Sequence, residues 1–210
     1  MAVITGVGGI FTRVWMLLGF TEFCLNLNEN PVFVKKMFDS IGDIQCRVLE
    51  RAVKLNKIGA FWYGDDLAYT EGLMVSPDVY RKYLLPWLEK LFGIAHKAEL
   101  PIIMHTDGDV RLLIDDLIKI GLNALHPIEP KAMDINELKK RYNGRLCLFG
   151  NIDMAGCLGR GTPDEVKQHV RKRIKDLAPG GGYAVGSSNS VAYYVPVKNY
   201  RAMLEATFEF

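Results

Sequence analysis

His105 and Asp107 are the two residues of this sequence best suited to chemistry. They lie two positions apart, directly after the apolar run Leu100–Met104. On an extended strand this spacing points two side chains to the same side. An imidazole and a carboxylate placed in this way can act in catalysis or bind a borderline metal ion such as Zn²⁺. The alternative is a structural pair, in which Asp107 only satisfies the imidazole.

Other polar residues also follow apolar runs. Glu129 stands between Ile128 and Pro130, and the prolines stiffen this stretch, so we predict a catalytic role for Glu129. For five further residues we predict contacts with substrate: Asp65, Asp66, Asn151, Asp153 and Asn189. The alternative for the aspartates is the capping of a turn or helix, which needs no ligand.

Six short apolar runs alternate with segments of helical period, and they are Ala2–Gly6, Ile58–Tyr63, Leu100–Met104, Ala124–His126, Leu146–Phe149 and Tyr183–Val185. The expected helices include one continuous helix from Ser76 through Lys97 and one over Val110–Ile120. Strands that alternate with helices indicate a parallel sheet, and runs that are apolar throughout indicate burial on both faces.

Nearly every run ends in polar residues, which favours a (β/α) barrel over an open, doubly wound sheet. In a barrel all strand ends meet at one mouth, whereas an open sheet needs polar loops only near its switch point. A closed barrel of this kind needs eight strands. We therefore expect an α/β protein of the (β/α)8 TIM-barrel type, a single domain over residues 1–210 that is incomplete at its N-terminus.

The composition excludes several classes of function. A chain of 210 residues with 49% hydrophobic residues and a net charge of +2 can bury one large core but lacks the concentrated basic surface that nucleic acid requires. No apolar stretch approaches the roughly 20 residues that span a bilayer, and the start of the chain has no basic signal-peptide region. The cysteines form no CxxC pair, so we expect free thiols in a cytoplasmic protein.

The strand-end motifs, taken in order, resemble the uroporphyrinogen decarboxylase (URO-D) superfamily. They are Gly64-Asp65-Asp66, Pro101 through Gly108, His126 through Pro130, Leu148 through Asp153, Gly161 through Val166, and Gly181 through Ser190. Each motif alone is weak, but six in order at the expected spacing cover essentially the whole chain. Members are (β/α) barrels roughly half as long again, so the resemblance implies that the first strand or strands are missing.

The resemblance implies an enzyme with one of two chemistries. One is the decarboxylation of uroporphyrinogen III to coproporphyrinogen III, a lyase step of porphyrin biosynthesis without cofactor or metal. The other is methyl transfer between a corrinoid and a thiol or folate, with zinc in the thiol-dependent members. The implied partners are a tetrapyrrole or corrinoid substrate or another small molecule, a corrinoid protein, and a second copy of the chain in a homodimer.

The segment His105-Thr106-Asp107-Gly108 resembles the HxC motif of the zinc-dependent methyltransferases, with Asp107 in place of the cysteine. Asn189 falls about where those enzymes have their last cysteine, and the decarboxylases usually lack a histidine at position 105. The histidine favours the methyltransferase branch. A decarboxylase and a catalytically silent truncated domain stay open as alternatives.

Overall fold

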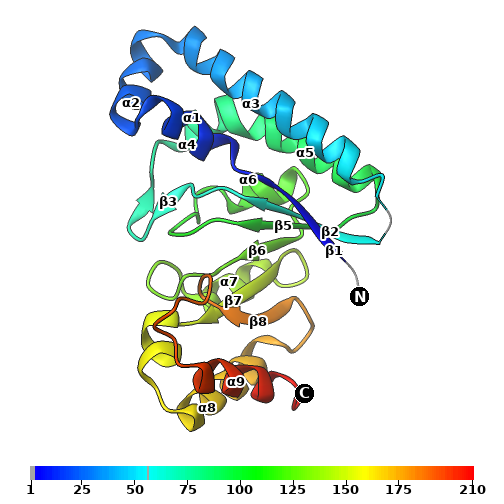
Figure 1. Ribbon diagram of the computed structural model, residues 1–210, viewed down its shortest axis with the longest axis vertical. Helices are drawn as coiled ribbons and strands as arrows, with labels where there is room; N and C mark the ends of the chain where they lie inside the picture. Colours follow the sequence, from blue (N-terminus) through cyan, green and yellow to red (C-terminus); the bar gives the residue numbers. More distant parts are fainter. Residues whose placement is uncertain (1–2, 56) are drawn as a thin grey trace. The chain divides into compact units, whose positions relative to one another are not determined.

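The computed structural model describes residues 3–55 and 57–210, in which strands and helices alternate along the chain (Figure 1). These residues fall into two compact units. The first contains the chain up to Ala68 with Leu73–Thr106 and Val110–Asn123, and the second contains Ala124–Phe210 with the short segments Tyr69–Gly72 and Asp107–Asp109.

The first unit contains three parallel strands in the order β1 (Val3–Gly8), β2 (Ile58–Gly64) and β5 (Ile102–His105). In the strand register Gly8 lies opposite Gly64, and Gly64 lies opposite His105. The three strands therefore end at the same level. The residues that follow them are brought to one edge of the sheet.

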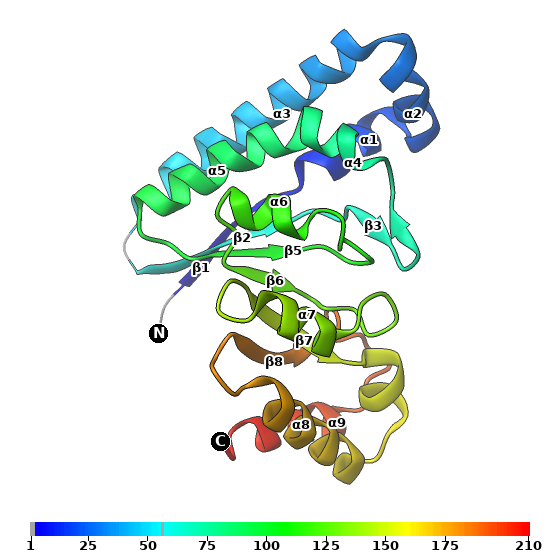
Figure 2. The ribbon, with the colours of Figure 1, turned by 180° about the vertical axis from the view of Figure 1, so that it is seen from behind.

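Helices cover this part of the sheet, and a short hairpin follows β2. The elements are α1 (Ile10–Leu18), α2 (Phe20–Glu29), α3 (Pro31–Ala52), the hairpin strands β3 (Ala68–Tyr69) and β4 (Gly72–Leu73), α4 (Pro77–Val79), the π-helical turn η1 (Tyr80–Leu84), α5 (Leu85–Lys97) and α6 (Ile114–Lys119). The long helices α3 and α5 run side by side in both views (Figures 1 and 2). Between α1, α2 and α3, the buried rings of Phe11, Phe23 and Phe38 form a chain of edge and tilted contacts with centroids 5.6 and 6.4 Å apart.

The second unit contains the parallel strands β6 (Ala124–His126), β7 (Cys147–Ile152) and β8 (Tyr183–Ser187), in that order. Its helices are α7 (Ile135–Tyr142), the π-helical turn η2 (Met154–Leu158), α8 (Pro163–Leu177) and α9 (Val197–Thr207). Thr162 and Glu165 form a reciprocal capping box at the start of α8, which the sequence signature predicts. Apolar side chains of β7, α8 and α9 form one buried cluster.

The structure confirms the α/β class and the six predicted strands within its described residues. The helix expected from Ser76 to Lys97 is confirmed in its bounds, as the consecutive elements α4, η1 and α5. It contains a π-helical turn before Pro86, which lacks the backbone N–H that a regular α-helix requires. One helix prediction was wrong in its bounds. The helix expected over Val110–Ile120 begins only at Ile114, after a turn. The single domain over residues 1–210 stays a prediction. Across the described residues no single helix has the length and hydropathy of a membrane span, and only the bent pair α1 and α2 meets such a test together.

Candidate functional site

Asp65, at the end of β2, holds the start of helix α1 in place. Its Oδ2 accepts hydrogen bonds from Phe11 N (2.9 Å) and Tyr63 Oη (2.6 Å), and its Oδ1 accepts one from Thr12 N (2.8 Å). Tyr63 Oη also accepts a hydrogen bond from Ile10 N. The helix has no capping side chain of its own, so a carboxylate from a distant strand satisfies its free amides.

The Asp65 carboxylate that anchors α1 is buried. Asp65 is 2% exposed, and burial raises the pKa of its carboxyl group while the hydrogen bonds from Thr12 and Tyr63 lower it. A Cβ at Gly9 would overlap the Asp65 carboxylate, so only glycine permits this approach of the loop. In the structure Asp65 positions α1, and its predicted contact with substrate stays a prediction.

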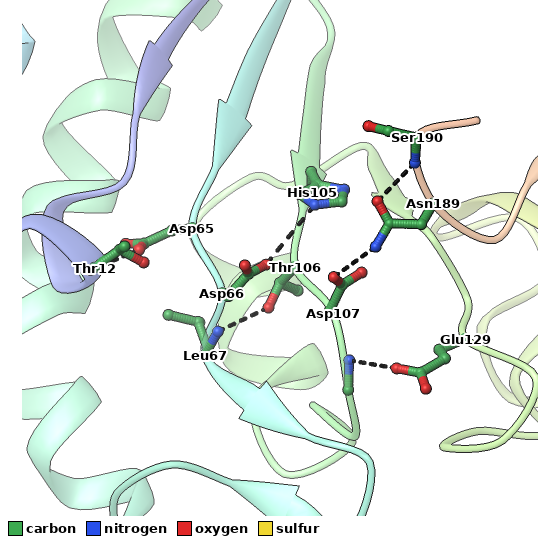
Figure 3. A network of polar contacts seen from close by, with 11 residues as sticks. Thr12, Asp65, Asp66, Leu67, His105, Thr106, Asp107, Glu129, Asn189 and Ser190 are labelled. Atoms are coloured by element: carbon green, nitrogen blue, oxygen red, sulfur yellow. Dashed lines mark hydrogen bonds and ion pairs between the residues drawn. The ribbon is translucent and has the colours of Figure 1, made fainter. Parts of the chain in front are cut away.

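His105 ends β5 and lies beside Asp66, which follows β2 (Figure 3). His105 Nε2 lies 3.7 Å from Asp66 Oδ1, and the imidazole stacks on Trp62 at a centroid distance of 5.9 Å. The side chains of His105 and Asp66 are 22% and 53% exposed, so the pair is accessible to a ligand.

The backbone around this pair is fixed from both strands. Asp65 N donates to His105 O at 2.9 Å, and Leu67 N donates to the buried Thr106 Oγ1 at 3.0 Å. These two hydrogen bonds clamp the end of β2 to the end of β5. The histidine and the aspartate are thereby held next to one another by the backbone.

A cavity of about 430 Å³ opens at this edge of the first unit, and it is lined by Gly9, Thr12, Arg13, Met16, Gly64, Asp65, Asp66 and His105. It therefore brings together three of the predicted site residues. It also contains Arg13, which the sequence analysis missed because an arginine on a helix is usually a solvated side chain. The sequence could have indicated Arg13 by its position, because it lies in the first turn of the helix that follows a strand end.

The second unit has its own polar network at its strand ends. Asn189 Nδ2 donates to Asp107 Oδ2 at 2.7 Å, which ties the loop after β8 to Asp107 (Figure 3). Glu129 Oε2 accepts from Gly108 N at 3.1 Å, and Glu129 Oε1 accepts from Thr70 Oγ1 at 3.2 Å. The predicted residues Asp107, Glu129 and Asn189 therefore form one network.

Asp153 joins these residues in the lining of a cavity of about 210 Å³, together with Lys131. Its Oδ1 also accepts from Ala155 N at 3.0 Å and so caps η2. Asn151 does not line this cavity. It is buried with a φ of 75°, and its Nδ2 donates to Ile128 O at 2.8 Å, which joins β7 to the loop after β6.

The residues present offer a partial set of metal ligands. His105 and Asp66 provide one nitrogen and one oxygen donor in the first unit, a combination that suits Zn²⁺. The predicted metal pair of His105 and Asp107 stays a prediction, because His105 belongs to the first unit and Asp107 to the network of the second. No cysteine lines either cavity of the described residues, so a thiolate ligand does not fit.

The four cysteines are free thiols, as predicted, and they are Cys24, Cys46, Cys147 and Cys157. Burial raises the pKa of each thiol. Because the thiolate is the reactive form, we expect the folded chain to react with iodoacetamide at pH 8 more slowly than glutathione does. Intact mass measured over time tests this, with the urea-unfolded chain as the fast control. Four thiols that react as fast as glutathione would contradict the burial.

Comparison with known proteins agrees with this architecture. The model of the family "Uroporphyrinogen decarboxylase (URO-D)" matches residues 1–210. A uroporphyrinogen decarboxylase from Ruthia magnifica is 19% identical over 87% of this chain and 51% of its own length. A methylcobamide:CoM methyltransferase from Methanosarcina acetivorans is 21% identical over 92% of this chain and 52% of its own length. The chain thus spans about half the length of these relatives.

A solved structure of a methyltransferase from Methanosarcina mazei matches the whole chain and 59% of its own chain, with a TM-score of 0.79 and 20% identity. At this identity the likeness shows the fold.

Proposed function

Because the chain belongs to the uroporphyrinogen decarboxylase family, we propose that it carries a methyl-transfer site, where a methyl group passes from a corrinoid to a small acceptor. The relatives include both a decarboxylase and a methylcobamide:CoM methyltransferase. The single observation that favours methyl transfer is the pairing of His105 with Asp66 in the strand-end cavity of the first unit. A corrinoid protein that delivers the methyl group belongs to the same proposal.

The pair suits an acceptor that must lose a proton. A thiol attacks as the thiolate, so its S–H proton has to be taken up near the point of attack. His105 Nε2 accepts this proton, and Asp66 stabilises the resulting imidazolium at 3.7 Å. The new S–C bond forms as the bond between the methyl group and the corrinoid breaks, and the electron pair of that broken bond stays with the corrinoid.

The same two side chains are the donors that would hold a metal ion. A bound Zn²⁺ supplies a positive charge that makes the acceptor easier to deprotonate. His105 and Asp66 would then orient the acceptor against the methyl group.

Charge in the two cavities disfavours the decarboxylase alternative. A substrate with many carboxylates needs several cations, but Arg13 is the one arginine or lysine among the described residues that line the first cavity. In the second cavity Lys131 faces three acidic residues, Asp107, Glu129 and Asp153. Such surroundings repel a polycarboxylate tetrapyrrole and tolerate a small acceptor.

The test is a comparison of two substrates with the full chain. The chain is incubated with methylcobalamin and a small thiol, and the loss of the methylcobalamin absorption spectrum is followed, while a parallel sample receives uroporphyrinogen III. We expect thiol-dependent demethylation and no decarboxylation. Conversion of uroporphyrinogen would favour the decarboxylase, and a folded chain inactive in both assays would favour the silent domain.

A further inference from the structure

We propose that two copies of this chain pair through one edge of the first unit, made of strand β1 and of the α3 flank, the side of α3 that carries Ile44 and Val48. The two β1 strands run antiparallel about a two-fold axis, and the two α3 helices pack against one another on one face of the joined sheet. The inference does not depend on the proposed function.

Strand β1 can accept a further strand. Among residues 3–55 and 57–210 it pairs with β2 on one side, and no strand pairs with its outer side. The strand contains no proline and no charged residue, which are the usual means of protecting an edge from pairing. Val3 and Ile4 are 50% and 56% exposed, although β-branched side chains favour a covered sheet. The chemistry of β1 is therefore that of an interior strand.

Helix α3 has two apolar faces, and one of them is exposed. The buried face consists of residues three or four positions apart, namely Val34, Phe38, Gln45 and Leu49. A Cβ at Gly42 would overlap the indole of Trp87, so Gly42 lies on the side of α3 that is turned to α5. Ile44 follows Gly42 by two residues, which places it on the opposite side, and Val48 lies one turn beyond it. These two side chains are 50% and 48% exposed, so the α3 flank faces away from α5 and is apolar.

Helix α1 extends this apolar surface. Met16 and Leu17 are 65% and 70% exposed, and with Ile41 and Ile44 of α3 they line a groove of about 310 Å³. Single exposed apolar side chains are common on proteins, but a set that is contiguous over neighbouring elements marks an interaction surface. The groove gives the side chains of a partner a place to pack between α1 and α3.

The charges beside the α3 flank favour a second copy as the partner. Asp43 and Arg47 form an exposed ion pair at 3.0 Å within α3. When two α3 helices pack antiparallel about Gln45, Asp43 of each copy lies opposite Arg47 of the other. A parallel arrangement would instead place like charges opposite one another. Helix α3 packs on β1, so antiparallel pairing of the strands also brings the two flanks together. One copy of the chain therefore supplies the strand, the apolar surface and the complementary charges at once.

The experiment measures the molecular mass of the full chain by sedimentation equilibrium over a range of concentrations, and we expect a dimer. Ile44→Asp and Val48→Asp each place an uncompensated charge in the paired flank, so each should raise the dimer dissociation constant at least about a hundredfold. Ile4→Lys places a charge on the edge strand and should also weaken the dimer. The three side chains are about half exposed in one chain, so the melting curve of the monomer should stay as in the wild type.

Leu112→Asp is the matched control, because Leu112 is 68% exposed in the turn before α6 and lies outside β1, α1 and α3. Its dissociation constant should equal that of the wild type. Asp43→Arg and Arg47→Asp each set like charges against one another twice across the two-fold axis, so each should raise the dissociation constant about tenfold. The double variant reverses both charges and should restore the wild-type value.

Three results would overturn the proposal. A wild type that melts cooperatively but stays monomeric at every concentration would leave the edge to a strand of another polypeptide. A dimer that survives both Ile4→Lys and Val48→Asp would pair through another surface. A double reversal that dimerises no better than the single variants would contradict the antiparallel arrangement. If Ile4→Lys does not fold, the charge reversals on exposed positions of α3 decide.

Discussion

Replacing His105 with alanine is expected to lower the rate of thiol-dependent demethylation of methylcobalamin by about 10²- to 10⁴-fold, the usual effect of losing a positioned acid or base. The reason is the location of the imidazole, which faces the cavity at the end of β5 and pairs with Asp66. The measurement is the initial rate at saturating thiol, so that a change in binding does not obscure the chemical step.

Two variants make this result specific. Asp66→Asn keeps the shape of the side chain but removes the charge that stabilises the imidazolium, and we expect an intermediate loss of about tenfold. His96→Ala removes an exposed histidine of α5 that lies outside the cavity, and its rate should be unchanged. If His105→Ala retains the wild-type rate in a folded chain, His105 is not the proton acceptor and the proposed function loses its main support.

Metal content distinguishes the two ways in which His105 could act. Elemental analysis of the purified chain should give about one zinc per chain if His105 and a carboxylate bind the ion, and His105→Ala should abolish it. A chain that is active without bound metal would identify His105 as the proton acceptor alone.

The alternation of strands and helices could be predicted because each element depends on residues that are close together in the sequence. Short runs such as Ile58–Tyr63 are apolar throughout. A strand that is buried on both faces requires apolar side chains at successive positions. Helix starts such as Asn30-Pro31 and Thr162 with Glu165 carry their own caps. The π-helical turn before Pro86 was not predicted, although the proline itself, which lacks a backbone N–H, is visible in the sequence.

The candidate site could be predicted only in part, because its contacts join residues far apart in sequence. The strand ends indicated His105, Asp107 and Glu129, but the pairing of His105 with Asp66 comes from the register of β2 and β5. Asn151 shares the polar character of the other strand-end residues, and only its backbone conformation turns the side chain away from the cavity that Asp107 lines. Residue type at a strand end therefore predicts candidates, and register selects among them.

Replacing Asp65 with alanine is expected to lower the free energy of unfolding by about 3 kcal/mol or more. The substitution leaves two buried donors, Phe11 N and Tyr63 Oη, and the part-buried Thr12 N without a partner, and each unsatisfied buried donor costs about 1–3 kcal/mol. Urea denaturation followed by circular dichroism measures the change.

The neighbouring aspartate is the control. Asp66 is 53% exposed, and its loss should change the free energy of unfolding by less than about 1 kcal/mol. Tyr63→Phe removes one hydrogen-bonding group and should lie between the two. If Asp65→Ala and Asp66→Ala are equally stable, Asp65 does not anchor α1.

The pH dependence of stability provides a second measurement of the same anchor. Burial raises the pKa of Asp65 in the folded chain above its unfolded value, so the folded state holds this proton more tightly. The stabilisation from protonated Asp65 is then fully present below the unfolded pKa, near 4, and is lost as the pH rises through the higher folded value. Asp65→Asn cannot titrate and should lack this component, so the difference in stability between wild type and Asp65→Asn should change with pH in that window. A difference that is constant from pH 3.5 to 8 would show that the carboxyl of Asp65 titrates as it does in the unfolded chain. The hydrogen bonds from Phe11, Thr12 and Tyr63 would then fully offset the effect of burial on the pKa of Asp65.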